Sequence, residues 1–141
     1  MFRSVLSVFL GFVLMMMLVM TYQMGLWMMM PDIFPTPEQI ESGDIPTMPI
    51  AINCVLLLID LLIGLFGGYF TVAIAGESRI NHAKALAIVV ILMSLASLSQ
   101  SLAMESTWYV TLRFLVVPIF VVIGGRLRCK QSSTPKPEPA S

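Results

Sequence analysis

The apolar segment at residues 50–76, IAINCVLLLIDLLIGLFGGYFTVAIAG, determines the fold predicted for this chain. An α-helix rises about 1.5 Å per residue, so roughly 20 apolar residues cross a hydrocarbon core about 30 Å thick. The segment exceeds that length and carries one charged residue, Asp60, near its middle. It is therefore predicted to be a membrane-spanning helix with an acidic side chain near the centre of the bilayer.

One face of this helix is formed by small and polar residues. At about 100° per residue, the residues that share a narrow arc are Asn53, Asp60, Gly64, Gly67, Thr71 and Ala75, with Gly68 at its edge. Small residues allow a neighbouring backbone to approach, and polar residues need partners away from lipid. We therefore expect this face to contact the rest of the protein, with Gly64, Gly67 and Gly68 as helix-packing residues.

The whole chain has the composition of a membrane protein. Of its 141 residues, 57 % are hydrophobic and 11 % are charged, and the net charge is zero. The mean hydropathy is +0.90. A soluble domain of this size would leave large apolar patches exposed. We therefore expect an all-α protein that has the lipid bilayer as a partner, and no nucleic-acid partner.

Further apolar segments complete an antiparallel four-helix bundle. The expected spans are residues 5–28, 50–76, 85–103 and 107–125. Together they form one transmembrane domain at residues 1–130. The polar, proline-rich residues 131–141, QSSTPKPEPAS, are expected to be a disordered cytoplasmic tail, because they have little apolar surface to bury.

Two connections between the spans have features of their own. Residues 31–49 are acidic and proline-rich, and Thr36 with Gln39 forms a capping box that predicts a short outer helix. This loop is open to two interpretations, a lid or docking loop and a solvated connector. The connection at residues 77–84 contains His82, which is expected to be a solvated loop residue.

The basic residues predict the orientation of the bundle. Seven of them lie on one side of the four-span arrangement: Arg3, Arg79, Lys84, Arg126, Arg128, Lys130 and Lys136. The loops on the other side contain no Lys or Arg. Because cytoplasmic loops are enriched in Lys and Arg, both termini are predicted to be cytoplasmic, and the acidic loop is predicted to face outward.

Two charged residues, Asp60 and Arg113, lie within the predicted spans. Asp60 lies about 15 Å below the outer edge and Arg113 about 7 Å below it, with Asn53 a little above Arg113. An aspartate near mid-bilayer costs roughly 2.5 to 3.5 kcal/mol, so we hypothesise that Asp60 and Arg113 pair, with Asn53 nearby. Such a cluster serves either as an ion, proton or substrate site, or as a structural pair that fixes which helices are neighbours.

Two other groups are weaker candidate sites. The first span has a stripe of methionines on one side, Met17, Met20, Met24 and Met28. Thioethers suit a soft metal such as Cu(I), but methionine is also an ordinary apolar packing residue. Ser94 and Ser97 belong to a small-residue stripe of the third span, which indicates either close helix packing or a polar pore lining.

No catalytic motif is recognised in the chain. It contains no nucleophile elbow, no HExxH, no P-loop and no dinucleotide fingerprint. Residues 63–93, IGLFGGYFTVAIAGESRINHAKALAIVVILM, and 112–128, LRFLVVPIFVVIGGRLR, resemble small, uncharacterised four-span bacterial inner-membrane proteins. The resemblance implies a bacterial plasma-membrane location, and it implies no activity and no site residues.

These observations lead to two functional expectations. The first is a non-enzymatic structural or accessory membrane protein without a cofactor, for example a subunit of a larger membrane complex, which contacts other membrane chains or itself. The alternative is a small oligomeric transporter or channel that uses Asn53, Asp60 and Arg113.

Overall fold

The computed structural model describes residues 2–31, 36–42, 48–76 and 80–132. Its helices are α1 (Phe2–Met29), α2 (Pro37–Ser42), α3 (Ile50–Ala75), α4 (Asn81–Ala96), α5 (Leu98–Met104) and α6 (Thr107–Ser132). The prediction of an all-α chain is confirmed. Three of the helices, α1, α3 and α6, are long and apolar enough to cross a membrane.

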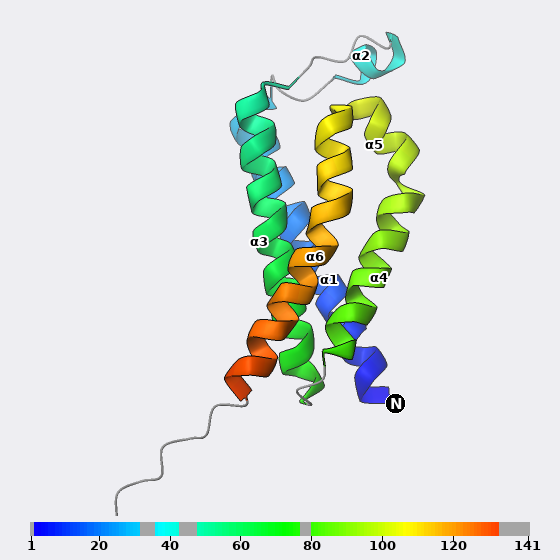
Figure 1. Cartoon of the computed structure of the whole chain (residues 1–141). Helices are drawn as coiled ribbons and strands as arrows, with labels where there is room; N and C mark the ends of the chain where they lie inside the picture. The colour runs from blue at the N-terminus through cyan, green and yellow to red at the C-terminus, as the bar shows by residue number, and fades with distance from the viewer. Residues whose placement is uncertain (1, 32–35, 43–47, 77–79, 133–141) are drawn as a thin grey trace, which may run out of the picture.

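The helices form a bundle of four rods, with α4 and α5 together making one rod (Figure 1). The chain reverses direction between successive rods, and α2 lies beyond one end of the bundle. The most extensive packing is between α3 and α6, while α1 contacts α3 and α4. The core therefore runs along α3 and α6, and the other two rods pack against this pair.

The glycine-rich face of α3 is buried between α6 and α1. All seven of the residues predicted to share that face are buried: Asn53, Asp60, Gly64, Gly67, Gly68, Thr71 and Ala75. A Cβ atom added to Gly68 would overlap the backbone carbonyl of Val121, and one added to Gly124 would overlap the backbone carbonyl of Leu65. The two backbones thus approach so closely that neither position has room for a side chain.

The third rod differs from its predicted form, which was one continuous span at residues 85–103. It begins earlier, at Asn81, and is divided into α4 and α5 at Ser97. The Ser97 hydroxyl donates a hydrogen bond to the carbonyl oxygen of Met93 at 3.1 Å. Serine hydroxyls that bond back to their own helix compete with the backbone ladder and bend helices. The Ser97 backbone leaves the regular helical values there, at φ −95° and ψ 1°, although its N–H still bonds to the carbonyl oxygen of Met93.

His82 also differs from expectation. The sequence analysis placed it in a solvated loop, but it lies in the first turn of α4 and is only 8 % exposed. The prediction was wrong because α4 extends toward the preceding turn. Its first two turns also bury Ala83, Leu86 and Ala87, and they close this end of the bundle.

The predicted outer helix is present as α2, while the start of the C-terminal tail differs from its prediction. The N–H of Thr36 donates to Oε1 of Gln39 at 2.9 Å, and the N–H of Gln39 donates to Oγ1 of Thr36 at 3.3 Å, which confirms the capping box before α2. At the other end α6 continues to Ser132, slightly past the predicted domain boundary. The remainder of the predicted tail, residues 133–141, lies outside the described residues.

Replacing Gly68 by alanine tests the close approach of α3 and α6. We expect Gly68→Ala to lower the free energy of unfolding in detergent by about 3 kcal/mol, at the upper end of overpacking effects, because a backbone carbonyl cannot rotate away. The matched control is Gly25→Ala in α1, where an added Cβ meets nothing within 4 Å. Equal stability of the two variants would contradict the packing described here.

Candidate functional site

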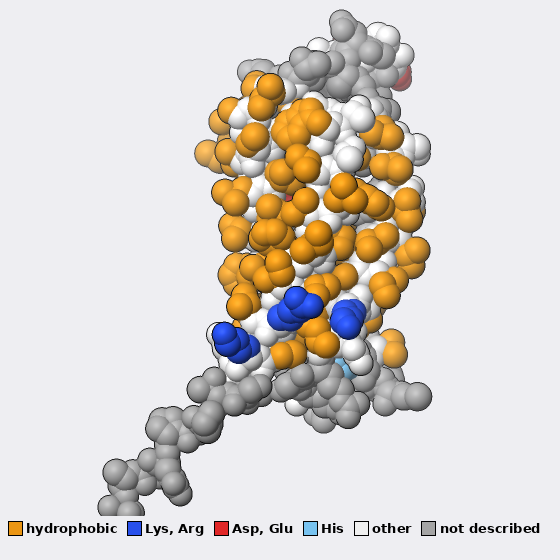
Figure 2. Space-filling view, viewed as in Figure 1, with side chains coloured by type: hydrophobic (Ala, Val, Ile, Leu, Met, Phe, Trp, Pro, Cys, Tyr) orange, Lys and Arg blue, Asp and Glu red, His pale blue; other side chains and the backbone are white. Residues whose placement is uncertain are grey.

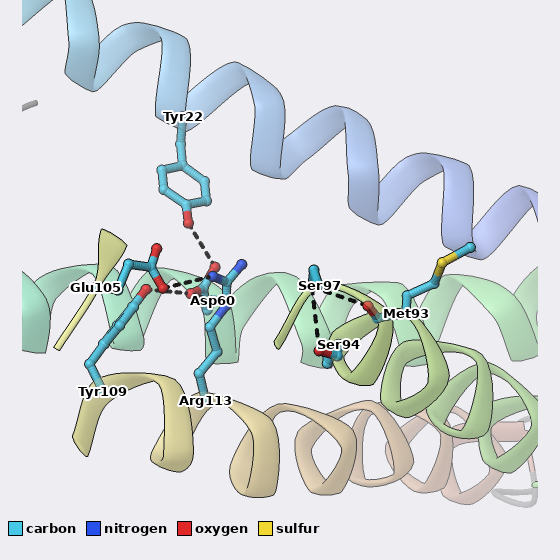
Figure 3. A network of polar contacts seen from close by, with 8 residues as sticks. All are labelled: Tyr22, Asp60, Met93, Ser94, Ser97, Glu105, Tyr109 and Arg113. Carbon is cyan, nitrogen blue, oxygen red and sulfur yellow. Dashed lines mark hydrogen bonds and ion pairs between the residues drawn. The ribbon is translucent and has the colours of Figure 1, made fainter. Parts of the chain in front are cut away.

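Asp60 is the centre of a polar cluster between three helices (Figure 3). Its side chain is only 4 % exposed. Oδ1 accepts a hydrogen bond from the Tyr22 hydroxyl at 2.8 Å, and Oδ2 accepts one from the Tyr109 hydroxyl at 2.9 Å. Nε of Arg113 lies 3.1 Å from Oδ2. The carboxylate of α3 is therefore bound by one residue of α1 and two of α6.

The sequence analysis identified Arg113 as a partner of Asp60 but missed both tyrosines. Tyr109 is buried, with 2 % of its surface exposed. It lies one turn before Arg113 on α6, so the two side chains share a face. A buried tyrosine hydroxyl usually has a hydrogen-bond partner. The four-residue spacing of Tyr109 and Arg113 was therefore a signal in the sequence that Tyr109 faces Asp60 beside Arg113.

Asn53 does not join this cluster. Its Nδ2 donates to Oγ of Ser106 at 3.4 Å, just before the start of α6. This contact connects the first part of α3 to the turn that precedes α6. The hypothesis of one cluster containing Asn53, Asp60 and Arg113 is therefore replaced by two separate contacts. The two contacts are separate because Asn53 lies about two turns from Asp60 along α3.

Glu105 is a second acidic residue near Arg113, and the sequence analysis gave it no role in the cluster. It follows the last residue of α5, and its Oε2 lies 3.8 Å from Nη1 of Arg113. That oxygen is buried and has no hydrogen-bond partner among the described residues. Burial raises the pKa of the Glu105 carboxyl above its ordinary value, while the positive charge of Arg113 opposes the rise.

A cavity of about 150 Å³ adjoins these charged residues. Residues of α1, α3, α4, α5 and α6 line it, together with Glu105. Its polar lining residues are Asp60, Ser94, Ser97, Ser101, Glu105 and Arg113. Ser94 and Ser97, for which the sequence left helix packing and a polar pore lining open, lie on the wall of this cavity. Beyond its first two turns, α4 has no fully buried residue, because the α4–α5 rod diverges from α6 before returning to it (Figure 1).

The methionine stripe of α1 lies away from this cavity. Met17, Met20, Met24 and Met28 are each more than half exposed. Met15 and Met16, from another side of the helix, line the cavity instead. Among the described residues, no group of three or more His, Cys, Asp or Glu side chains is arranged to hold a metal ion.

The arrangement around Asp60 limits the chemistry of that carboxylate. Donors on neighbouring helices already hold both of its oxygens, and these three contacts use most of the roughly four acceptor positions of an ionised carboxylate. Oε2 of Glu105 carries no such hydrogen bond among the described residues. Comparison of the chain with family models, curated proteins and solved structures found no match.

A double-mutant cycle tests the contact between Asp60 and Arg113. We expect Asp60→Asn and Arg113→Gln each to lower the free energy of unfolding by about 3 kcal/mol, because the first removes the carboxylate partner of the half-buried Arg113 and the second leaves the buried Asp60 charge with hydroxyl donors alone. The double variant should lose less than the sum of the two. The measurement is equilibrium unfolding in detergent.

The control for this cycle is Tyr69→Phe, which removes an exposed hydrogen bond to Gln131. It should cost less than about 1 kcal/mol. Strictly additive losses in the Asp60 and Arg113 variants would show that the two side chains are not coupled.

Proposed function

We propose that this chain is an integral membrane protein whose four rods form an antiparallel bundle. The proposal is supported by the apolar side chains on the surface of the rods. Large apolar side chains are exposed on α1, α3, α4 and α6, and they cover most of the visible face (Figure 2). In the most apolar part of α3, 33 % of the residues are buried within the protein. Lipid is the environment that suits the outward-facing remainder.

We further propose that both termini are cytoplasmic. The described basic residues at the start of α4 and the end of α6 are Lys84, Arg126, Arg128 and Lys130. These helix ends lie at the same end of the bundle (Figure 1), and Figure 2 shows Lys and Arg gathered there. The acidic residues Glu38 and Glu41 belong to α2, beyond the opposite end. Cytoplasmic loops are enriched in Lys and Arg, so the basic end is the one that we propose faces the cytoplasm.

Cysteine labelling tests this orientation. In a background with Cys54→Ser and Cys129→Ser, we expect Glu41→Cys to react with a membrane-impermeant maleimide in intact bacterial cells. Arg126→Cys should react only after the membrane is disrupted, because its end of the bundle faces the cytoplasm. The opposite pattern of labelling would reverse the proposed topology.

The function that the geometry favours is that of a structural or accessory protein of the plasma membrane. The observation that supports it is that Tyr22, Tyr109 and Arg113 together hold both oxygens of Asp60. An acidic group held by donors of two other helices stabilises one arrangement of those helices, whereas a proton or ion carrier must exchange its partners. Such a bundle would act through contacts that its exposed apolar faces make with other membrane chains or with copies of itself.

One observation favours a second candidate, a small transporter or channel. The cavity beside Arg113 has polar residues in its wall, and Glu105 adds a buried carboxylate oxygen without a hydrogen-bond partner among the described residues. A polar cavity inside a membrane bundle is a common form of substrate site.

Purification in a mild detergent distinguishes these two functions. For an accessory protein, we expect a tagged chain to recover unrelated membrane proteins in a fixed stoichiometric ratio by mass spectrometry. Asp60→Asn should weaken that recovery in proportion to its loss of folded protein, because Asp60 acts on the fold. A homo-oligomer without a partner, together with substrate uptake into vesicles, would instead assign the chain to transport.

A further inference from the structure

The basic ends of α4 and α6 pack directly against each other. A Cβ atom added to Gly125 would overlap the side chain of Ala83, so these two small residues lie where the rods meet. Lys84 follows Ala83 along α4, and Arg126 follows Gly125 along α6. Since one residue advances a helix by about 1.5 Å, the two cations lie at nearly the same level of the bundle.

The two cations also lie on the same side of this contact. One residue turns a helix by about 100°, and α4 and α6 run in opposite directions (Figure 1). One step forward along each of two facing antiparallel helices therefore turns both side chains toward one shared side. Lys84 and Arg126 are both exposed, and Figure 2 shows neighbouring Lys and Arg side chains at this end of the visible face. Together they form a cation pair.

The cation pair has no acidic partner within the described part of the chain. The acidic residues described there are Glu38, Glu41, Asp60 and Glu105, which belong to α2, to the middle of α3 and to the turn before α6. The ion pairs among described residues join two of these to Arg113. Two like charges at one level repel each other, so an anion placed between them would be attracted by both.

An apolar column extends from the cation pair toward the middle of the bundle. At about 100° per residue, Ile88 and Leu95 share the face of the lysine on α4. On α6, Ile119 and Leu115 share the face of the arginine. All four side chains are at least half exposed. The column is about 16 Å long at about 1.5 Å per residue, close to half of a hydrocarbon core about 30 Å thick. Its length therefore matches one leaflet.

We propose that an anionic phospholipid binds to this face, with its phosphate between Lys84 and Arg126 and an acyl chain along Ile88 and Ile119. Helix axes that pack together are about 8 to 10 Å apart, so one phosphate can reach both cations. It accepts charge-assisted hydrogen bonds from each of them, and the guanidinium can bind it through two N–H groups.

The same features favour a lipid of net negative charge over the other phosphate sources. A choline or ethanolamine head group would bring a third positive charge to the cation pair, and a free phosphate would leave the apolar column unused. The site rests on the proposed insertion of the chain in a membrane. It does not depend on the accessory function, because a lipid can bind whether or not the bundle has a partner chain.

Native mass spectrometry of the full chain in a non-ionic detergent tests the proposal. The protein is titrated with phosphatidylglycerol and with phosphatidylcholine that has identical acyl chains. We expect the first phosphatidylglycerol to bind at least about tenfold more tightly, because its charge is not cancelled within the head group. Equal affinities of the original chain for the two lipids would overturn the proposal.

Matched variants connect this preference to the cation pair. Lys84→Gln and Arg126→Gln should each weaken phosphatidylglycerol binding by about tenfold, while phosphatidylcholine binding is unchanged. Lys84→Arg keeps the charge and should keep the preference. The control is Arg128→Gln, which removes the same charge from α6. The guanidinium carbon of Arg128 lies 5.7 Å from the ring centre of Tyr69 on α3, away from the cation pair.

The control variant separates a defined site from general attraction to a basic surface. Arg128→Gln should change phosphatidylglycerol affinity by less than about twofold, because charges outside the site are screened. An equal loss in Arg128→Gln and Arg126→Gln would show that only the total charge matters, and it would overturn the site.

Two further measurements identify the source of the phosphate and the level at which a failure occurs. Glycerol 3-phosphate has no acyl chains and should leave the lipid bound, whereas displacement of the lipid by this soluble anion would overturn the lipid as occupant. Extraction of cell membranes with alkaline carbonate tests insertion by itself. A chain that fails only at the lipid site stays in the membrane pellet, whereas a chain that is not inserted is released.

Discussion

The hydrogen bonding of one buried carboxylate constrains the whole bundle. Asp60 lies in the middle of an apolar helix, and leaving its charge without partners would cost several kcal/mol. Tyr22 and Arg113 reach it from α1 and α6. These contacts are directional, so they specify how the helices are rotated as well as which helices are neighbours. Apolar packing alone constrains rotation less, because one apolar helix face resembles another in lipid.

The two ends of the bundle differ in how tightly the helices pack. Toward the basic end, Gly124 lies against the backbone of Leu65, and Gly125 against Ala83. Toward the other end, the interruption at Ser97 lets the α4–α5 rod diverge from α6. Small residues and an unbroken helix allow close approach in the first case, whereas serine back-bonding interrupts the helix in the second. The cavity lies toward this second end, where the α4–α5 rod diverges from α6.

Arg113 links the contact that stabilises the fold to the cavity. Through Nε it contacts Asp60, and through Nη1 it lies near Glu105. The fold and the cavity can therefore be tested separately, through Asp60 for the fold and Glu105 for the cavity.

Some of these features were determined by the sequence itself. Helical periodicity placed Gly64, Gly67 and Gly68 on one buried face with Asp60, because the 100° step is local to the chain. The cost of burying Asp60 indicated that it needs a partner. The identity of all its partners, the separate contact of Asn53 and the burial of His82 were decided by the tertiary structure. Each depends on how far one helix turns and slides against another. The cavity depends on the same variables, since it exists only where two rods diverge.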